Sequence, residues 1–287
     1  MGKKIIHFFI VLALILLGTF LYSRYVGITG LVVKERKIVN ATLPSSFHGL
    51  KIIQISDLHY GNTVSQKEMK KLVKKINEIK PDIIVLTGDL LDKDIILKEK
   101  EQSILTNLLG KMGATIGKYA IKGENDVPHK EWESIMTESS FINLNDTFEL
   151  IYQDEYTPIL LAGMSTNLKV KKSPKEKIET TLQAIEEYKN KEGNALYSIL
   201  LMHEPDYIDQ FSYSSFHLIL AGHSHGGQIN LPLIKNALLP KGSKKYTKEH
   251  YKKGNTEFYI STGIGTNSLT YRLGNRPSIQ FYRLVTK

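Results

Sequence analysis

Residues 51–92 read KIIQISDLHYGNTVSQKEMKKLVKKINEIKPDIIVLTGDLLD, and the pattern within them changes from strand to helix and back to strand. The β-rich run KIIQIS at 51–56 opens the stretch, and DIIVLTG at 82–88 reads as a second buried strand after Pro81. Between these runs, apolar residues recur at helical spacing from 65 to 79. The alternation predicts an α/β domain whose first strands run parallel.

The same alternation continues to the end of the chain. Helical patterns cover 99–109 and 174–188, whereas strand patterns cover 31–39, 114–123, 158–163, 196–203, 216–223, 257–262 and 278–285. The stretch 235–253 is rich in lysine and poor in apolar residues, so it predicts an exposed loop. No internal repeat interrupts this organisation.

The composition permits an enzyme but does not require one. A chain of 287 residues with 41% hydrophobic content can bury a substantial core. The net charge of +9 favours an anionic partner, and nucleic acid, acidic lipid and cell-wall polyanions are all candidates. Because the chain contains no cysteine, disulfides, thiolate metal sites and cysteine nucleophiles are excluded. Any metal must therefore be held by nitrogen and oxygen atoms.

The N-terminal segment 5–22, IIHFFIVLALILLGTFLY, is an apolar run near the lower length limit for a membrane-spanning helix. Lys3 and Lys4 precede the run and outnumber Arg24 after it, so the positive-inside rule places the N-terminus in the cytoplasm and the rest outside. A cleaved signal peptide is the alternative, but FLYSRY at 20–25 lacks the small residues that a signal peptidase needs.

This pattern predicts a single-pass protein of the cell membrane with an extracytoplasmic catalytic domain. We expect a membrane anchor at 1–25, a linker with an edge strand at 26–48 and one folded domain at 49–287.

Residues of the types that bind metals follow five of the expected strands. They are Asp57 and His59, Asp89 and Asp92, Glu124 with Asn125 and Asp126, His203, and His223 with His225. The carboxyl ends of neighbouring strands in an open α/β sheet converge on one crevice, so these side chains can meet in one site. A lone Asp-x-His is more often a helix cap or a surface pair, but five such groups at five strand ends predict a metal site.

Taken together, these motifs resemble the calcineurin-like metallophosphoesterases, specifically the bacterial branch with an N-terminal membrane or export segment. The resemblance runs from about residue 50 to the C-terminus. It includes Asp-x-His at 57–59, Gly-Asp-x-x-Asp at 88–92, a histidine before Glu-Pro-Asp at 203, Gly-His-x-His at 222–225 and the tail STGIGTNSLTYRLGNRP at 261–277. The resemblance implies a four-layer α/β/β/α sandwich.

The resemblance also implies a distribution of ligands over two divalent metal ions. One ion would be bound by Asp57, His59 and His225, the other by His203 and His223, and Asp89 would bridge both; Asp92 would support the site without ligating. Mixed nitrogen and carboxylate ligands suit manganese, iron or zinc. Such a pair of ions activates water for attack on phosphorus and neutralises charge on the phosphate.

One motif departs from the family pattern. Where the family has Gly-Asn-His followed by an acid, this chain has Gly123, Glu124, Asn125 and Asp126. In the direct alignment Glu124 replaces the asparagine ligand and Asn125 replaces a histidine that assists the leaving group, although an amide cannot act as an acid. If the loop is shifted by one residue, Asn125 is the ligand and Asp126 occupies the position of the acid. The direct alignment is preferred for Glu124.

Four further residues have open interpretations. His129 lies close enough in sequence to replace the missing histidine, and an exposed loop histidine is the plainer expectation. Trp132 is expected in the core, with a wall of the substrate site as the alternative. Arg272, together with Tyr271, lies in the family-like tail and is a candidate for a position near the phosphate.

The function expected from these features is hydrolysis of a phosphate ester, either a phosphomonoester or a phosphodiester, at the outer face of the membrane. A phospholipid, a lipid-linked sugar phosphate and a wall polymer are the natural substrate classes, and no nucleic acid partner is expected. The alternative is a degenerate relative that binds a metal or a polyanion without catalysis, because the motif histidine is replaced by Asn125.

Overall fold

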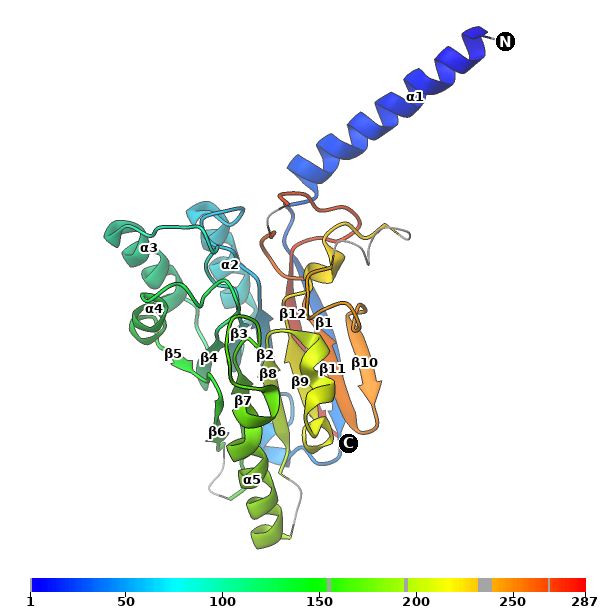
Figure 1. The fold of residues 1–287 in the computed structure, drawn as a ribbon. Coiled ribbons are helices and arrows are strands. Elements are labelled where there is room, and N and C mark those ends of the chain that lie inside the picture. Colours follow the sequence, from blue (N-terminus) through cyan, green and yellow to red (C-terminus); the bar gives the residue numbers. More distant parts are fainter. Residues whose placement is uncertain (1, 154–155, 194–195, 232–238, 268) are drawn as a thin grey trace.

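The computed structural model describes residues 2–153, 156–193, 196–231, 239–267 and 269–287. Its helices are α1 (Gly2–Leu21), α2 (Gln66–Ile79), α3 (Glu99–Gly110), α4 (Trp132–Glu138) and α5 (Pro174–Glu192). Its strands are β1 (Val32–Asn40), β2 (Lys51–Ile55), β3 (Ile83–Thr87), β4 (Gly117–Ile121), β5 (Phe141–Asn143), β6 (Thr147–Ile151), β7 (Ile159–Met164), β8 (Ser198–Met202), β9 (Leu218–Ala221), β10 (His250–Lys253), β11 (Thr256–Ile260) and β12 (Ser278–Thr286). These elements are arranged as Figure 1 shows.

The strands form two sheets of six strands each. The first has the order β1-β12-β2-β3-β4-β5 and the second the order β10-β11-β9-β8-β7-β6. Strands β2, β3, β4 and β5 run parallel in the first sheet, as β7, β8, β9 and β11 do in the second. The C-terminal strand β12 lies between β1 and β2, parallel to the former and antiparallel to the latter.

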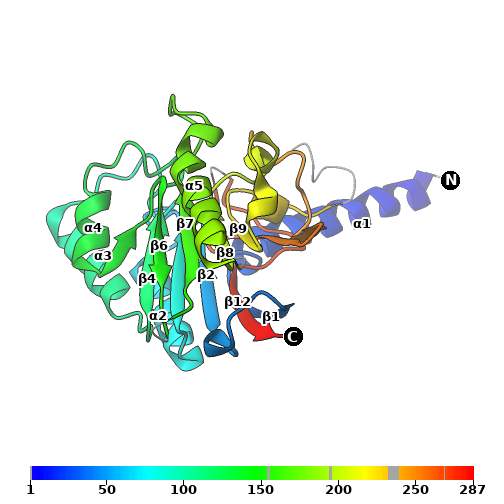
Figure 2. The ribbon, with the colours of Figure 1, turned by 90° about the horizontal axis from the view of Figure 1, so that it is seen from below.

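Three hydrophobic clusters hold four layers together. Alternate residues of β2 belong to two different clusters, because successive side chains of a strand point to opposite faces. Ile53 packs with helices α2, α3 and α4, and Ile52 packs between the two sheets. The third cluster joins the outer face of the second sheet to α5, where Ile178 is fully buried. Figure 2 shows α2, α3 and α4 grouped on one side of the sheets. The predicted four-layer α/β/β/α sandwich is therefore confirmed.

Short elements depart from the sequence-based expectations. Helix α4 and strands β5 and β6 were not predicted, and β10 lies within the stretch 235–253 that was expected to be loop alone. Tyr246 in that stretch is buried against Tyr251 and Phe258. Residues 235–238 lie outside the described part of the chain. The remainder of the stretch is thus partly tied to the second sheet.

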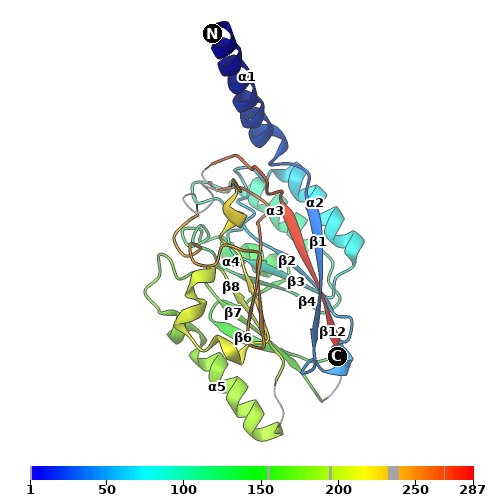
Figure 3. The same cartoon turned by 90° about the vertical axis from the view of Figure 1, so that its right-hand side faces the viewer.

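The N-terminal helix α1 extends away from the sandwich (Figure 3). None of its residues is buried, and together with the π-helical turn Tyr22–Val26 it is long and apolar enough to cross a membrane. A 20-residue helix is about 30 Å long, which matches the hydrocarbon thickness of a bilayer. The chain then enters β1 at the edge of the first sheet.

Candidate metal centre

The seven predicted ligands meet at the carboxyl ends of five strands. Asp57 and His59 follow β2, Asp89 follows β3, Glu124 follows β4, His203 follows β8, and His223 and His225 follow β9. The expectation of a crevice in one open sheet is wrong in one respect, because β8 and β9 belong to the second sheet. The site therefore lies where the edges of two stacked sheets come together.

Asp57, His59 and His225 form the first group of potential ligands. They offer ligand atoms that lie within 4.8 Å of one another, and all three residues are buried. The imidazoles of His59 and His225 stack with their Nε2 atoms 3.1 Å apart. The Asp57 carboxylate is oriented by the Ser56 hydroxyl at 2.5 Å and by the backbone N–H of His223 at 2.9 Å. The backbone of one predicted ligand thus holds the side chain of another.

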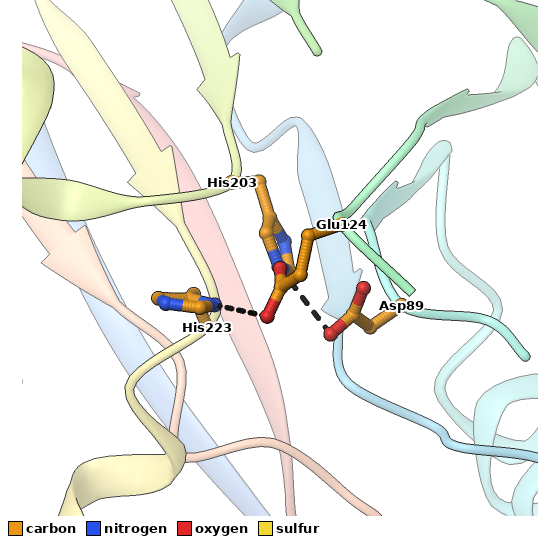
Figure 4. Close-up of side chains that lie close together, drawn as sticks. All are labelled: Asp89, Glu124, His203 and His223. Atoms are coloured by element: carbon orange, nitrogen blue, oxygen red, sulfur yellow. Dashed lines mark ion pairs between the residues drawn. The ribbon is translucent and has the colours of Figure 1, made fainter. Parts of the chain in front are cut away.

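Asp89, Glu124, His203 and His223 form the second group, again within 4.8 Å of one another. Figure 4 shows their side chains pointing toward a common centre. Glu124 lies 2.7 Å from His203 Nε2 through one oxygen and 3.1 Å from His223 Nδ1 through the other. Oδ2 of Asp89 lies 3.5 Å from His203 Nε2 and 3.7 Å from His59 Nε2. Asp89 therefore lies between the two groups.

Main-chain carbonyls set the orientation of two imidazoles. His203 Nδ1 lies 2.7 Å from the carbonyl of Thr87, and His223 Nε2 lies 2.8 Å from the carbonyl of Lys241. Because a carbonyl only accepts, each of these ring nitrogens carries the hydrogen. The opposite nitrogens, His203 Nε2 and His223 Nδ1, are left to face the second group with a free lone pair when the rings are neutral. Such hydrogen bonds orient histidine ligands.

The backbone is strained where the ligands are displayed. The φ angles of five predicted ligands lie in the left-handed region: Asp57 at 52°, His59 at 46°, Asp89 at 54°, His223 at 65° and His225 at 48°. For residues with a Cβ, this conformation costs roughly 1–2 kcal/mol each. Strain of this kind clusters at functional sites and persists because the surrounding structure holds it.

The loop 123–126 resolves into distinct positions for its side chains. A Cβ added to Gly123 would lie 2.2 Å from Asp89 Oδ1, so glycine is needed for this close approach. Glu124 points at the two histidines, whereas Asn125 donates to Asp89 through its backbone and side-chain amides. Asp126 is fully buried and accepts hydrogen bonds from the backbone N–H groups of Leu91 and Gly123. Glu124 thus faces the second group from this loop, and the choice between the direct and the shifted alignment stays a prediction.

The acid Asp92 lies beside the first group of ligands. Its Oδ2 is 3.8 Å from His59 Nδ1 and accepts a hydrogen bond from Asn62 at 3.0 Å. Asp92 is absent from both groups of described residues that converge on a potential ion position. Its side chain is therefore placed to support His59.

Three neighbouring residues are used by the fold. His129 is 6% exposed, so the expectation of an exposed loop histidine is wrong; its Nε2 donates to the carbonyl of Asp92. Trp132 is fully buried in the core, as expected. Arg272 is also fully buried, and its guanidinium donates to the carbonyls of Thr262 and Gly265. These contacts use the guanidinium to hold the backbone, and a position of Arg272 near the phosphate stays a prediction.

Some orienting groups gave no sequence signal. The carbonyls of Thr87 and Lys241 belong to the main chain, which every residue carries, so no motif marks them. Ser56 is different, because a hydroxyl directly before the Asp-x-His motif was visible in the sequence. Its hydrogen bond to Asp57 could have been suggested from that position alone.

Charge in the site favours a cation at its centre. Burial alone would lower the pKa of His203, but the carboxylates of Asp89 and Glu124 outweigh that effect and raise the pKa well above its usual value. Burial and the neighbouring His59 lower the pKa of His225 well below its usual value. In the second group, the neighbouring carboxylates therefore favour the protonated form of His203. Because imidazole ligates only when neutral, a bound cation would replace such a proton.

The residues fit a pair of divalent ions on the observations of this structure. Within the described part of the chain, His203 Nε2 and Glu124 Oε2 are buried without a hydrogen bond although they are only 2.7 Å apart. In the first group, His59 Nε2 lies 3.1 Å from His225 Nε2 and 3.7 Å from Asp89 Oδ2. Buried polar atoms normally have partners, so atoms that converge without them indicate an ion position. Nitrogen and carboxylate donors are those that manganese, iron and zinc accept.

Comparisons with known proteins agree with this geometry. The family model described as calcineurin-like phosphoesterase matches residues 50–227. The uncharacterized metallophosphoesterase YkuE of Bacillus subtilis is 31% identical over 270 residues, which cover 93% of this chain and 90% of that protein.

Two other relatives carry informative names. The transmembrane protein with metallophosphoesterase domain of Danio rerio is 27% identical, and the match covers 83% of this chain and 53% of that protein. The UDP-2,3-diacylglucosamine pyrophosphatase LpxG of Chlamydia muridarum is 26% identical, with 68% of this chain and 70% of that protein covered. Since the family match spans more than half of the chain and includes every residue of both ligand groups, the chain belongs to the calcineurin-like phosphoesterase family.

Proposed function

We propose that the protein hydrolyses a phosphate ester of the cell envelope at the outer face of the membrane, using two divalent metal ions. The observation that carries this proposal is the convergence of seven buried or half-buried ligand side chains into two adjacent groups. Surface carboxylates often cluster without a ligand. Groups that combine carboxylates with oriented imidazoles at five strand ends are typical of metal centres.

The proposed ligands divide between the two ions as the two groups do. Asp57, His59 and His225 would hold one ion, and Glu124, His203 and His223 the other. Asp89 would contribute to both, because its Oδ2 lies between His59 and His203. When bound, two divalent ions supply Lewis-acid stabilisation of the charge on the phosphate and lower the pKa of water. Manganese, iron and zinc are the candidates.

Residues of the loop 123–126 limit which substrates can react quickly. The Asn125 side chain donates a hydrogen bond to Asp89, and an amide cannot donate a proton as an acid. The carboxylate of Asp126 is occupied by two backbone N–H groups. We therefore propose a substrate whose leaving group needs little protonation, such as a sugar phosphate that is displaced when water attacks the other phosphorus of a pyrophosphate bond.

Membrane attachment and charge support an envelope substrate. The helix α1 would keep the domain at the membrane surface, and Lys3 and Lys4 in its first turn favour an outward-facing domain. The net charge of +9 attracts anionic lipids and wall polymers. A relative named for its action on a diacylated glucosamine nucleotide adds a precedent for a lipid-derived substrate.

The test uses the full chain purified in detergent and loaded with manganese. We expect hydrolysis of bis-p-nitrophenyl phosphate, together with loss of that activity in Asp89→Ala. Glu187→Gln, which changes an exposed carboxylate on α5, is the matched control and should retain full activity. Activity of the unaltered chain no higher than that of Asp89→Ala rejects the proposal. If the chain is active, lipid profiling of a strain that lacks the protein would identify the phosphate ester that accumulates.

A non-catalytic relative that binds metal or polyanions is the second candidate, and Asn125 in place of the motif histidine favours it. This candidate predicts two bound ions per chain by elemental analysis while every phosphoester tested stays intact. Recovery of hydrolysis in Asn125→His would support it. Turnover by the unaltered chain would eliminate it.

A further inference from the structure

The segment that follows the membrane helix is docked on a loop of the domain. The carbonyl of Ser23 accepts a hydrogen bond from the backbone N–H of Arg272 at 3.0 Å, and the rings of Phe20 and Tyr271 lie 5.3 Å apart. Ser23 is only 6% exposed, in contrast to the exposed residues of α1. Figures 1 and 3 show the C-terminal loop beside the base of α1.

Gly27 makes the closest contact of this docked segment. Its own N–H donates to the carbonyl of Tyr22 at 2.8 Å and closes the π-helical turn. A Cβ at this position would lie 1.9 Å from the carbonyl oxygen of Arg272. Any side chain at Gly27 would therefore push the juxtamembrane segment and the loop apart. By contrast, a Cβ at Gly18 within α1 would meet nothing within 4 Å.

The other end of Arg272 reaches the backbone beside the candidate metal centre. Its guanidinium donates to the carbonyls of Thr262 and Gly265. The N–H of Gly265 in turn donates to the carbonyl of Asp57 at 2.8 Å. A Cβ at Gly263 would lie 3.0 Å from Asp57 Cβ and 3.1 Å from His225 Nδ1. The loop that Arg272 braces is thus in direct contact with the first group of ligands.

Asn275 provides a second connection from the same loop. Its side-chain amide donates to the carbonyl of His225, and a Cβ at Gly226 would lie 2.4 Å from Asn275 Nδ2. The backbone of Leu273 also pairs with Gln228 and Asn230, which follow the Gly-His-x-His motif. The loop therefore contacts both Asp57 and His225 through independent hydrogen bonds.

From these contacts we infer that the docked segment Phe20–Gly27 positions the first group of ligands through Arg272 and Asn275. The juxtamembrane segment would thereby help to set the metal affinity of Asp57, His59 and His225. The inference rests on the proposed metal site. Arg272 is a positioning residue, because it contacts the carbonyls of Thr262 and Gly265 beside Asp57 and contacts no reacting atom. Loosening the anchor should weaken one of the two metal positions without abolishing the fold.

The experiment compares Gly27→Ala with Gly18→Ala in the full chain, reconstituted in lipid nanodiscs. For a second pair, Phe20→Leu removes the ring contact with Tyr271, and Phe9→Leu changes an exposed phenylalanine of the same helix. Manganese binding is measured by titration and by the number of ions retained. Hydrogen exchange of residues 261–277 is measured in the metal-free proteins, which requires neither activity nor metal.

We expect about 10-fold weaker manganese binding at one of two positions in Gly27→Ala, by analogy with other losses of orienting partners. In Gly27→Ala we also expect faster hydrogen exchange at residues 262–265. The increase in exchange should be smaller in Phe20→Leu and absent in the controls Gly18→Ala and Phe9→Leu. The melting temperature of the domain should change little, which separates local loosening from general destabilisation. Unchanged exchange and unchanged manganese binding in both test variants would overturn the inference.

The two proposals can fail separately. If the unaltered chain binds manganese and hydrolyses phosphate esters but Gly27→Ala behaves identically, only the coupling to the anchor is wrong. If the unaltered chain binds no manganese, the proposed function and its metal site fail, and the inferred role of the anchor in metal binding fails with them. The exchange data then still report whether the docked segment holds the backbone of residues 262–265, which lies beside Asp57.

Discussion

Asn125 holds Asp89 through two hydrogen bonds, from its backbone N–H at 2.9 Å and from its side-chain amide at 2.6 Å. Both carboxylate oxygens of Asp89 are therefore engaged by one neighbour. Since Asp89 lies between the two groups of ligands, Asn125 fixes the carboxylate on which both proposed ions depend. Asn125, which departs from the family pattern, thus orients the Asp89 carboxylate but cannot act as an acid.

Replacing Asn125 by histidine should separate these two contributions. A protonated imidazole can assist a leaving group, and general acid catalysis typically contributes about 10²–10⁴-fold. We therefore expect Asn125→His to accelerate hydrolysis of alkyl phosphodiesters by at least about 10-fold. For p-nitrophenyl esters, whose leaving group needs little protonation, the rate should change far less. The ratio of the two rates is the measurement.

Asn125→Ala is the control for this comparison, because it removes the side-chain hydrogen bond to Asp89 without adding an acid. Both esters should then react more slowly than with the unaltered chain. If Asn125→His slows both esters as much as Asn125→Ala does, orientation of Asp89 is the sole contribution of this position.

Glu124 and Asp126 should respond to mutation in opposite ways. Removing the Glu124 side chain takes a carboxylate from His203 and His223, so Glu124→Ala should retain one ion per chain instead of two. Asp126→Ala leaves the buried N–H groups of Leu91 and Gly123 unpaired, at roughly 1–3 kcal/mol each. It should therefore lower the melting temperature by several degrees while two ions remain. Elemental analysis and thermal unfolding measure the two effects.

The reverse result would restore the shifted alignment of the loop 123–126. In that case Asp126→Ala would lose an ion or abolish turnover at unchanged stability, and Glu124→Ala would behave like the unaltered chain.

Much of the fold could be predicted because the central strands β3, β7, β8 and β9 are buried along their whole length. Continuous apolar runs such as those at β3 and β8 are the sequence pattern of parallel strands between covering layers. The ends of these runs also marked the ligands, since polar residues directly after a buried strand are conspicuous. Short elements gave no such pattern: α4 has seven residues, β5 has three, and β10 alternates between exposed and half-buried positions.

Relations between distant segments could not be predicted for a physical reason. Periodicity reports which face of an element is buried but not which sheet it joins, so the expected single crevice was in fact a junction of two sheets. The same limit applies to Arg272. Its sequence position suggested a phosphate contact, whereas its two terminal guanidinium nitrogens donate to the carbonyls of Thr262 and Gly265, which only the folded loop brings near.

Asp209 should make stability depend on pH at the acid end. Burial alone would raise the pKa of Asp209, but hydrogen bonds from Lys245, Lys253 and Tyr246 lower it to about 2. A lowered folded-state pKa stabilises the fold above the unfolded-state pKa of about 4, and this contribution disappears as the pH falls from about 4 to 2. Because the site is partly exposed, solvent screening limits the effect to about 1 kcal/mol.

Asp209→Asn should accordingly unfold at a lower denaturant concentration than the unaltered chain at pH 7. The difference should shrink steadily below pH 4. Glu187→Gln, on an exposed face of α5, should show no difference at any pH. A difference for Asp209→Asn that stays constant from pH 7 to pH 3 would show that the carboxylate charge does not stabilise this cluster.

The orientation of the chain in the membrane can be tested directly because the sequence contains no cysteine. A single Glu187→Cys on α5 should react with a membrane-impermeant maleimide in intact cells, whereas Gly2→Cys should react only after lysis. The physical cause is the pair Lys3 and Lys4 in the first turn of α1, which favours retention of the N-terminus in the cytoplasm. Adding Lys3→Glu and Lys4→Glu should therefore reduce labelling of Glu187→Cys in intact cells. Labelling of Gly2→Cys in intact cells, with Glu187→Cys protected, would place the domain in the cytoplasm, reject an envelope substrate and make intracellular phosphodiesters, including nucleic acid, the relevant class.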